Sequence, residues 1–243
     1  ATGSVKGRGY DSYTGGLVGE AYSTTDSSYA TGNVKGGGYD SYTGGLDGYN
    51  EYGISKSHAS GNVSGGGYES YVGGLTGYSD DDVTLSRATG NVTGSTDDYE
   101  SSIGGLIGYQ ESGYNVHKSY ATGNVVDNGD EGYVGGLIGE NIGATVSGSY
   151  ATGAVTSNTS YPYVGGLVGY NEGAINNSYA TGAVSLTGGA VTPSGYDGYA
   201  GGLLGYNNAT VTGSWATGNV IVNSLYTDAG GLIGENTGAV DAW

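Results

Sequence analysis

The chain contains no cysteine, methionine or phenylalanine, and only 2 of its 243 residues are proline. Without cysteine there can be no disulfide, no thiolate metal site and no thiol nucleophile. The scarcity of proline excludes a collagen helix even though 54 residues are glycine, because collagen needs abundant proline and a glycine at every third position. So much glycine also disfavours long helices, since each interior glycine costs about 1 kcal/mol relative to alanine.

Basic residues are scarce as well. The 6 Lys and Arg residues stand against 23 Asp and Glu residues, which gives a formal net charge of −17. Such a polyanionic surface repels phosphate backbones, so we expect no nucleic-acid partner. No run approaches the ~20 apolar residues of a membrane helix, so we expect no membrane insertion in this segment. Disorder is disfavoured, because 36% of the residues are hydrophobic and many of them recur at regular spacing.

What the chain does have is an internal repeat with three anchors. A first phrase, Ser-Tyr-Ala-Thr-Gly-Asn-Val, occupies residues 28–34 and 119–125 and has variants elsewhere. A second phrase, Gly-Gly-Leu-x-Gly, follows in each copy, and a branched residue such as Ile54 or Val83 comes five positions before the next alanine. The alanines of the first phrase are Ala1, Ala30, Ala59, Ala88, Ala121, Ala151, Ala180 and Ala216, and the second phrase begins at Gly15, Gly44, Gly73, Gly104, Gly135, Gly165, Gly201 and Gly230.

Each anchor is typical of a short strand bounded by glycine-rich turns. One coil of about 29 residues cannot bury its own apolar face, so successive coils must stack. We therefore expect a single all-β domain, a right-handed parallel β-helix (β-solenoid) of about eight coils with three short strands per coil. A β-propeller is the alternative, but its blades need about 40 residues each. The expected coils are approximately 1–29, 30–58, 59–87, 88–120, 121–150, 151–179, 180–215 and 216–243, with insertions bulging out near Asp97 and Asp98, at Gln110 to His117, and at Leu186 to Ser194.

Alternation along the first phrase assigns the faces of the coil. The small or apolar positions of residues 28–34 hardly vary between copies, which predicts that Ser28, Ala30, Gly32 and Val34 point inward. In the second phrase the leucine is invariant, whereas the x position accepts aspartate in one copy and threonine in another. We therefore expect the leucine inside and the x position outside.

Stacking turns each outward position into a ladder of equivalent side chains. The aromatic ladders either brace a glycine-rich backbone or bind glycans, and the first is favoured because aromatic cross-strand pairs commonly stabilise sheets. A flat grid of threonine and asparagine also resembles the surfaces of some ice-binding proteins. The predicted outward ladder residues are Thr31, Asn33, Thr89, Asn91, Thr122, Asn124, Tyr49, Tyr78, Tyr109, Tyr170 and Tyr206.

The second phrase and the residues after it resemble a known repeat. Residues 44–50 (GGLDGYN) and 165–171 (GGLVGYN) are similar to the GLUG motif, which occurs in repeat arrays of bacterial surface proteins and of some IgA-peptidase proteins. The resemblance covers the whole chain. It implies a solenoid similar to the stalks of filamentous-haemagglutinin-type adhesins, and it implies no catalytic activity in this segment. Copies with Glu20, Glu140 or Glu235 in place of the tyrosine depart from the motif.

The sequence gives little support for chemistry, and we expect no enzyme. The two histidines, His58 and His117, are isolated, and the acidic runs at residues 80–82 and 97–98 resemble turn insertions more than the paired carboxylates of a polysaccharide-active enzyme. No cofactor is expected apart from calcium. Residues 36–42 and their counterparts partly resemble a calcium-binding β-roll, which makes Asp11, Asp40 and Glu69 candidate calcium ligands, although an oxygen-ligand site needs six or more donors.

These observations favour a structural or adhesive segment of an extracellular or cell-surface bacterial protein or fibre. It would act as a rigid rod in attachment, matrix or biofilm formation. We expect end-to-end self-association or binding to other surface or matrix components, because a solenoid without terminal caps exposes unpaired strand edges. The alternatives are a ligand-binding surface, for ice on the threonine and asparagine ladders or for glycans on the tyrosine ladders, and a polysaccharide-active enzyme.

Overall fold

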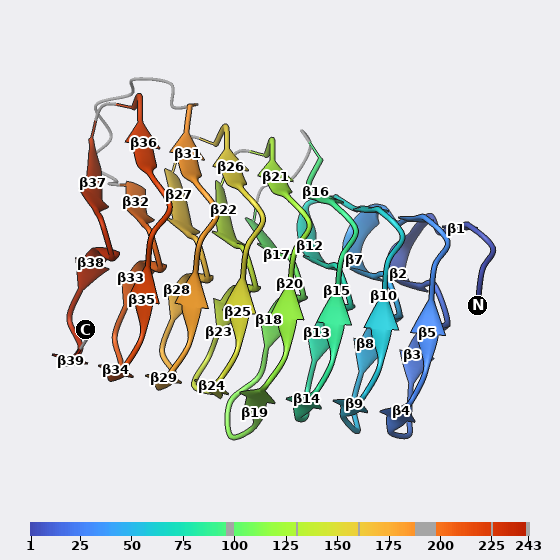
Figure 1. Cartoon of the computed structure of the whole chain (residues 1–243). Helices are drawn as coiled ribbons and strands as arrows, with labels where there is room; N and C mark the ends of the chain where they lie inside the picture. Colours follow the sequence, from blue (N-terminus) through green and yellow to red (C-terminus); the bar gives the residue numbers. More distant parts are fainter. Residues whose placement is uncertain (96–99, 130, 160, 188–197, 225, 242–243) are drawn as a thin grey trace.

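The computed structural model describes residues 1–95, 100–129, 131–159, 161–187, 198–224 and 226–241. Within these ranges the protein is built from β-strands and turns, and no helix there is long and apolar enough to cross a membrane. The strands form parallel sheets, here called A to E, and each coil of the chain adds one strand to each sheet in turn. The coils lie side by side in sequence order from the blue N-terminal end to the red C-terminal end (Figure 1).

Sheets A and B each contain eight strands. Sheet A comprises β1 (Val5–Lys6), β6 (Val34–Lys35), β11 (Val63–Ser64), β16 (Val92–Thr93), β21 (Val125–Asp127), β26 (Val155–Ser157), β31 (Val184–Leu186) and β36 (Val220–Val222). Sheet B comprises β2 (Gly9–Gly15), β7 (Gly38–Gly44), β12 (Glu69–Gly73), β17 (Glu100–Gly104), β22 (Glu131–Gly135), β27 (Tyr161–Gly165), β32 (Gly198–Gly201) and β37 (Thr227–Gly230).

Sheets C and D also contain eight strands each, and sheet E contains seven. Sheet C comprises β3 (Val18–Ala21), β8 (Asp47–Asn50), β13 (Thr76–Ser79), β18 (Ile107–Gln110), β23 (Ile138–Asn141), β28 (Val168–Asn171), β33 (Leu204–Asn207) and β38 (Ile233–Asn236). Sheet D comprises β4 (Thr25–Asp26), β9 (Ile54–Ser55), β14 (Val83–Thr84), β19 (Asn115–His117), β24 (Thr145–Ser147), β29 (Ile175–Asn176), β34 (Val211–Thr212) and β39 (Val240–Asp241). Sheet E comprises β5 (Tyr29–Ala30), β10 (His58–Ala59), β15 (Arg87–Ala88), β20 (Tyr120–Ala121), β25 (Tyr150–Ala151), β30 (Tyr179–Ala180) and β35 (Trp215–Ala216).

The register between coils joins equivalent residues of the repeat. Ala59, for example, pairs with Ala30 on one side and with Ala88 on the other. This confirms the predicted parallel β-solenoid, but each coil contains five short strands instead of three. The difference arises at the anchors. The first phrase bends at residues 31–33 and divides between sheets E and A, and the second phrase bends after its glycines and divides between sheets B and C.

The bend in the second phrase overturns one predicted orientation. Asp47 and Thr76 occupy the x position, and both are fully buried. Alternation holds within a strand, but here it restarts at the bend, so the leucine in the bend and the residue after it both point inward. Glycine is required at this bend because a Cβ on Gly44 would lie 1.9 Å from the carbonyl oxygen of Asp47, and one on Gly45 would lie 2.1 Å from that of Gly74.

The buried side chains form two columns of apolar contacts along the solenoid. The larger contains the leucines of the second phrase, the alanines of sheet E and the branched residues of sheet D, for example Leu75, Ala88 and Val83. The smaller joins sheets A and B through residues such as Val92 and Val134. Of the expected insertions, the one at Gln110 to His117 is a turn with Ser112 and Gly113 exposed, and those near Asp97 and at residues 188–194 lie outside the described residues.

A column of serines closes the corner between sheets D and E. The hydroxyl of Ser86 donates to the carbonyl oxygen of Thr84 at 2.8 Å and accepts the backbone N–H of Ser57 at 3.1 Å. The same N–H to Oγ bond continues from Ser86 to Ser119 at 3.1 Å and onward along the column. From Ser57 to Ser214 the inward serines are buried with their hydroxyl groups bonded, whereas Ser28 in the first coil is half-buried. They satisfy backbone groups that the corner would otherwise leave unpaired.

The residue before each of these serines adopts a left-handed backbone conformation. Its φ is 48° at Lys56 and 52° at Leu85, whereas other coils place glycine here, at Gly148 and Gly213. A left-handed conformation costs a residue with a Cβ about 1–2 kcal/mol. Leu85 is 51% exposed and so gains little from burial to offset this cost.

Replacing Leu85 by Gly should therefore stabilise the fold by about 1 kcal/mol, since glycine adopts this conformation without strain. The measurement is the urea midpoint and m-value of the Leu85→Gly variant against the unmodified chain. Leu85→Val serves as the control, because a β-branched residue with positive φ should be destabilising. A lower midpoint for Leu85→Gly would contradict the left-handed assignment.

Two buried side chains in the described ranges carry a carboxyl group, Asp47 and Asp127, and burial shifts the pKa of Asp47 strongly. Asp47 lies in sheet C with no exposed surface, and Asn50 Nδ2 donates to its Oδ2 at 3.1 Å. Burial raises the pKa of Asp47 from 3.8 to about 6. Below pH 4 the group is protonated in the folded and the unfolded chain alike. As the pH rises from about 4 to about 6, the unfolded chain loses the proton while the folded chain retains it, so stability falls, by about 3 kcal/mol in total.

Asp47→Thr should remove most of this pH dependence and stabilise the chain by about 2 kcal/mol at pH 8. Threonine fits the position, because Thr76 occupies it in the next coil and its hydroxyl donates to the carbonyl oxygen of Tyr78 at 2.9 Å. Denaturant titrations at pH 4, 6 and 8 measure the effect, with Asp228→Thr as the exposed control. Equal pH dependence in the two variants would refute the buried-carboxyl account.

Candidate functional surfaces

The predicted threonine and asparagine ladders lie on the outer surface. Thr31, Thr89 and Thr122 are exposed, as are Asn33, Asn91 and Asn124. The two ladders lie in the bend between sheets E and A and belong to no strand, whereas the ice-binding alternative places both on one strand face. Asparagine also has a structural role here, because each Oδ1 accepts the backbone N–H of the residue one coil further on.

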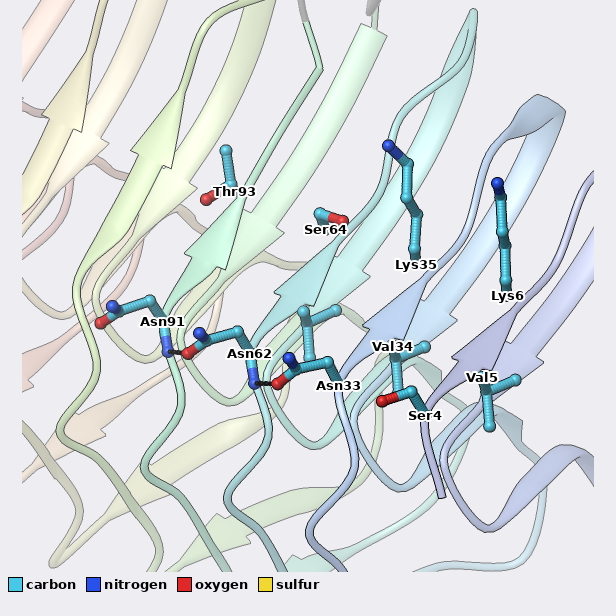
Figure 2. Close-up of a pocket in the computed structure, with 11 residues that line it drawn as sticks. Ser4, Val5, Lys6, Asn33, Val34, Lys35, Asn62, Ser64, Asn91 and Thr93 are labelled. Atoms are coloured by element: carbon cyan, nitrogen blue, oxygen red, sulfur yellow. Dashed lines mark hydrogen bonds between the residues drawn. The ribbon is translucent and has the colours of Figure 1, made fainter. Parts of the chain in front are cut away.

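Figure 2 shows this asparagine ladder on the first coils. Asn33 Oδ1 accepts from the backbone N–H of Asn62 at 2.9 Å, and Asn62 Oδ1 accepts from that of Asn91 at 3.0 Å. The ladder continues through Asn91 to Asn124 and ends on the backbone N–H of Ala154. The carboxamide nitrogens donate no hydrogen bond within the described ranges, so they are available to a ligand.

A second asparagine ladder is buried, and it uses the asparagine of the GLUG-like phrase. Asn141 Nδ2 donates to Asn171 Oδ1 at 2.8 Å, and Asn171 Nδ2 donates to Asn207 Oδ1 at 2.8 Å. Each carboxamide also binds a backbone carbonyl of its own coil, as Asn171 binds Gly173 at 2.7 Å. The asparagine of this motif therefore holds the turn between sheets C and D and is closed to a ligand.

The predicted tyrosine ladder lies on the outer face of sheet C and is half-buried. Its rings stack on one another, with centroids 5.1 Å apart for Tyr49 and Tyr78, 4.6 Å for Tyr78 and Tyr109, and 5.0 Å for Tyr170 and Tyr206. Tyrosines of sheet B pack edge-on against them, as Tyr71 does against Tyr78 at 5.6 Å.

Carboxylates accept hydrogen bonds from this ladder. Tyr78 Oη donates to Glu111 at 2.8 Å and Tyr170 Oη donates to Glu172 at 2.7 Å. Burial, together with nearby carboxylates such as Glu111, raises the pKa of Tyr109 to about 12. The same causes, and the bond to Glu111, raise the pKa of Tyr78 further. Because the ring faces cover one another, the ladder offers ring edges and hydroxyl groups instead of the open faces on which a sugar would stack. This geometry favours the bracing role.

Sheet E carries another aromatic column on its outer face. Tyr120, Tyr150, Tyr179 and Trp215 stack with interplanar angles of 1° to 3°. His58 stacks on Tyr29 at 5.3 Å, and burial, with a smaller effect of Arg87, lowers the pKa of His58. His58 is thus one member of a structural column.

The remaining candidates for chemistry are dispersed. His117 Nδ1 lies 2.8 Å from Ser147 Oγ. In the acidic turn after β13, Asp80 accepts from Tyr49 Oη at 3.4 Å, and Asp82 Oδ1 accepts from the backbone N–H of Asn115 at 2.7 Å. These carboxylates cap the neighbouring coil. The counterpart at residues 97–98 lies outside the described part of the chain.

The candidate calcium ligands form a column on sheet B, where Asp40 pairs with Asp11 and with Glu69. The stacking therefore does bring the three carboxylates into neighbouring coils. Among the described residues, however, no three His, Cys, Asp or Glu side chains are grouped closely enough to hold a metal ion. One oxygen of Asp40 is buried without a hydrogen-bond partner. The column remains a prediction for calcium.

One feature was not predicted from the sequence. Two adjoining hollows run along sheet A and the glycine-rich turns that follow it, with volumes of about 500 Å³ and 780 Å³. Lys6, Lys35 and Asn33 line the first, and Arg8 and Lys35 line the second. We call the two hollows together the basic groove. The signal was present in the sequence, because Lys6 and Lys35 occupy the same position of successive copies.

The fold and the ladders define the protein as a repetitive parallel β-solenoid with structural side-chain columns. Comparison with protein families finds the GLUG motif at residues 130–156 and 160–185. These two stretches of the chain are therefore GLUG repeats, as their phrases suggest. No curated protein and no solved structure matches the chain.

The two asparagine ladders differ in a way that mutation can measure. Asn171→Ala should destabilise the fold by about 2–3 kcal/mol, because it leaves a buried amide of Asn141 without its acceptor. Asn91→Ala should cost about 1 kcal/mol or less, since water can replace an exposed bond. Thermal and urea unfolding of both variants check this. Equal losses would contradict the assignment of the motif asparagine to the interior.

Proposed function

We propose that the chain is a rigid rod segment of an extracellular bacterial surface protein or fibre, in which it serves attachment or matrix formation. The observation that carries the proposal is the unbroken register of its five parallel sheets, in which equivalent residues pair from coil to coil. Bending or twisting such a rod would disturb several hydrogen-bonded ladders at once. The GLUG repeat supports the surface location, because such arrays occur in bacterial surface proteins.

The surface composition agrees with this role. A net charge of −17 keeps parallel rods apart and dissolved, since like charges repel over distances of about a Debye length. The aromatic columns add lateral stiffness, because each stacked pair contributes about 0.5–1.5 kcal/mol. The expected partners are a further copy of the rod, joined end to end, or other components of the surface or matrix.

Imaging and surface labelling test the proposal together. Antibodies against the chain should label intact cells of its source organism as strongly as permeabilised ones, and negative-stain images of the parent protein should show slender rods. Imaging with and without a chelator reports whether the rod depends on calcium. Labelling that requires permeabilisation would refute the surface location, and globular particles would refute the rod.

A further inference from the structure

We propose that the basic groove binds a linear acidic polysaccharide, a chain of sugars that carries carboxylates. The inference concerns the first four coils and stands on their geometry, independent of whether the rod is a surface fibre. It differs from the glycan-binding alternative above, because the tyrosine ladder of sheet C takes no part.

The first argument is the distribution of charge. The chain has only 6 basic residues. Lys6, Lys35 and Arg8 line the groove, and no Asp or Glu of the described part of the chain lines either hollow. These three residues form no ion pair within the described ranges, whereas Lys56 pairs with Asp26. The groove is thus a cationic site on a polyanionic rod.

The second argument is the register of the two lysines. Lys6 pairs directly with Lys35 in neighbouring strands of sheet A, and their side chains extend in the same direction (Figure 2). Like charges opposite each other on adjacent strands are destabilising. The next two coils place Ser64 and Thr93 in this column, so the fold itself does not need the lysines. An anion bound across both ammonium groups would relieve the repulsion.

The third argument is the polar lining. The carboxamides of Asn33, Asn62 and Asn91 line the groove with their oxygens bonded to the backbone, which leaves the nitrogens as donors. The hydroxyls of Ser64 and Thr93 stand beside them. These donors recur at the coil spacing of about 4.8 Å, so they suit a repetitive ligand rich in oxygen that lies along the axis.

A polysaccharide fits this site better than a nucleic acid or a membrane. Nucleic-acid grooves expose aromatic faces on which bases stack, whereas the aromatic side chains here, Tyr39 and Tyr68, stack on each other with ring centroids 4.8 Å apart. An anionic bilayer presents a broad negatively charged surface, which the acidic residues outside the groove repel. A single narrow polysaccharide chain lies within the groove and leaves the rest of the acidic surface uncovered.

The test uses residues that other coils already carry at the same register. The groove variant combines Lys6→Ser, Arg8→Gly and Lys35→Thr. The new residues are those at equivalent positions of other coils, namely Ser64, Gly37 and Thr93. The control variant combines Lys56→Ser, Arg87→Tyr and Lys118→Asn, which copy Ser27, Tyr120 and Asn177 at the equivalent positions of other coils. Each set removes three positive charges, so both change the net charge from −17 to −20 by the same subtraction. A cooperative urea unfolding transition in each establishes that both variants fold.

Binding is measured by calorimetry or biolayer interferometry with polygalacturonate, its methyl-esterified form, oligothymidylate and phosphatidylserine vesicles. We expect the unmodified chain and the control variant to bind polygalacturonate equally, and the groove variant to bind at least about tenfold more weakly. Esterification should abolish binding, and added salt should weaken it. Equal losses in the two variants, no binding by the unmodified chain, or groove-dependent preference for the oligonucleotide or the vesicles would overturn the proposal.

Discussion

Each coil of this protein must follow the backbone path of the coil beneath it, because every strand obtains its hydrogen-bond partners from neighbouring coils. This constraint explains the side chains that hardly vary. Glycine occupies the second-phrase bends because a Cβ there would meet the backbone of its own or the next coil, as at Gly44 and Gly45. Serine and asparagine occur at corners because their polar groups bind the backbone groups that a turn leaves without a strand partner.

The same constraint explains why conspicuous residues are mostly structural. A tyrosine repeated in successive coils must stack on its counterpart, and stacking hides the ring faces that a ligand would use. The GLUG asparagine is turned inward for the same reason, since one carboxamide can bind both its own turn and the next carboxamide. A binding site on such a surface is therefore more readily recognised where a column departs from its usual residue, as the lysines of sheet A do.

The periodicity of the sequence was sufficient to predict the solenoid, the stacking of equivalent residues and the inward serines. It was not sufficient to locate the bends. Alternation of small and large side chains continues through residues 28–34 although the strand is broken there, so five strands looked like three. Aspartate at residue 47 suggested an exposed position, because a substitution pattern cannot show that burial raises a pKa and that a neighbouring Asn50 supplies a hydrogen bond. The basic groove needs residues from four coils, and this grouping becomes visible only when the coils are stacked.

Register between equivalent residues also governs how such a protein can change in length. A coil can be removed or duplicated as a unit, because the strands on either side of the cut present the same columns to each other. Insertions within a coil are accommodated only at turns, as between β18 and β19. Loss or gain of part of a coil would shift the remaining strands out of register and break all five sheets at that point. The rod is therefore free to evolve in length by whole coils, while its cross-section stays fixed.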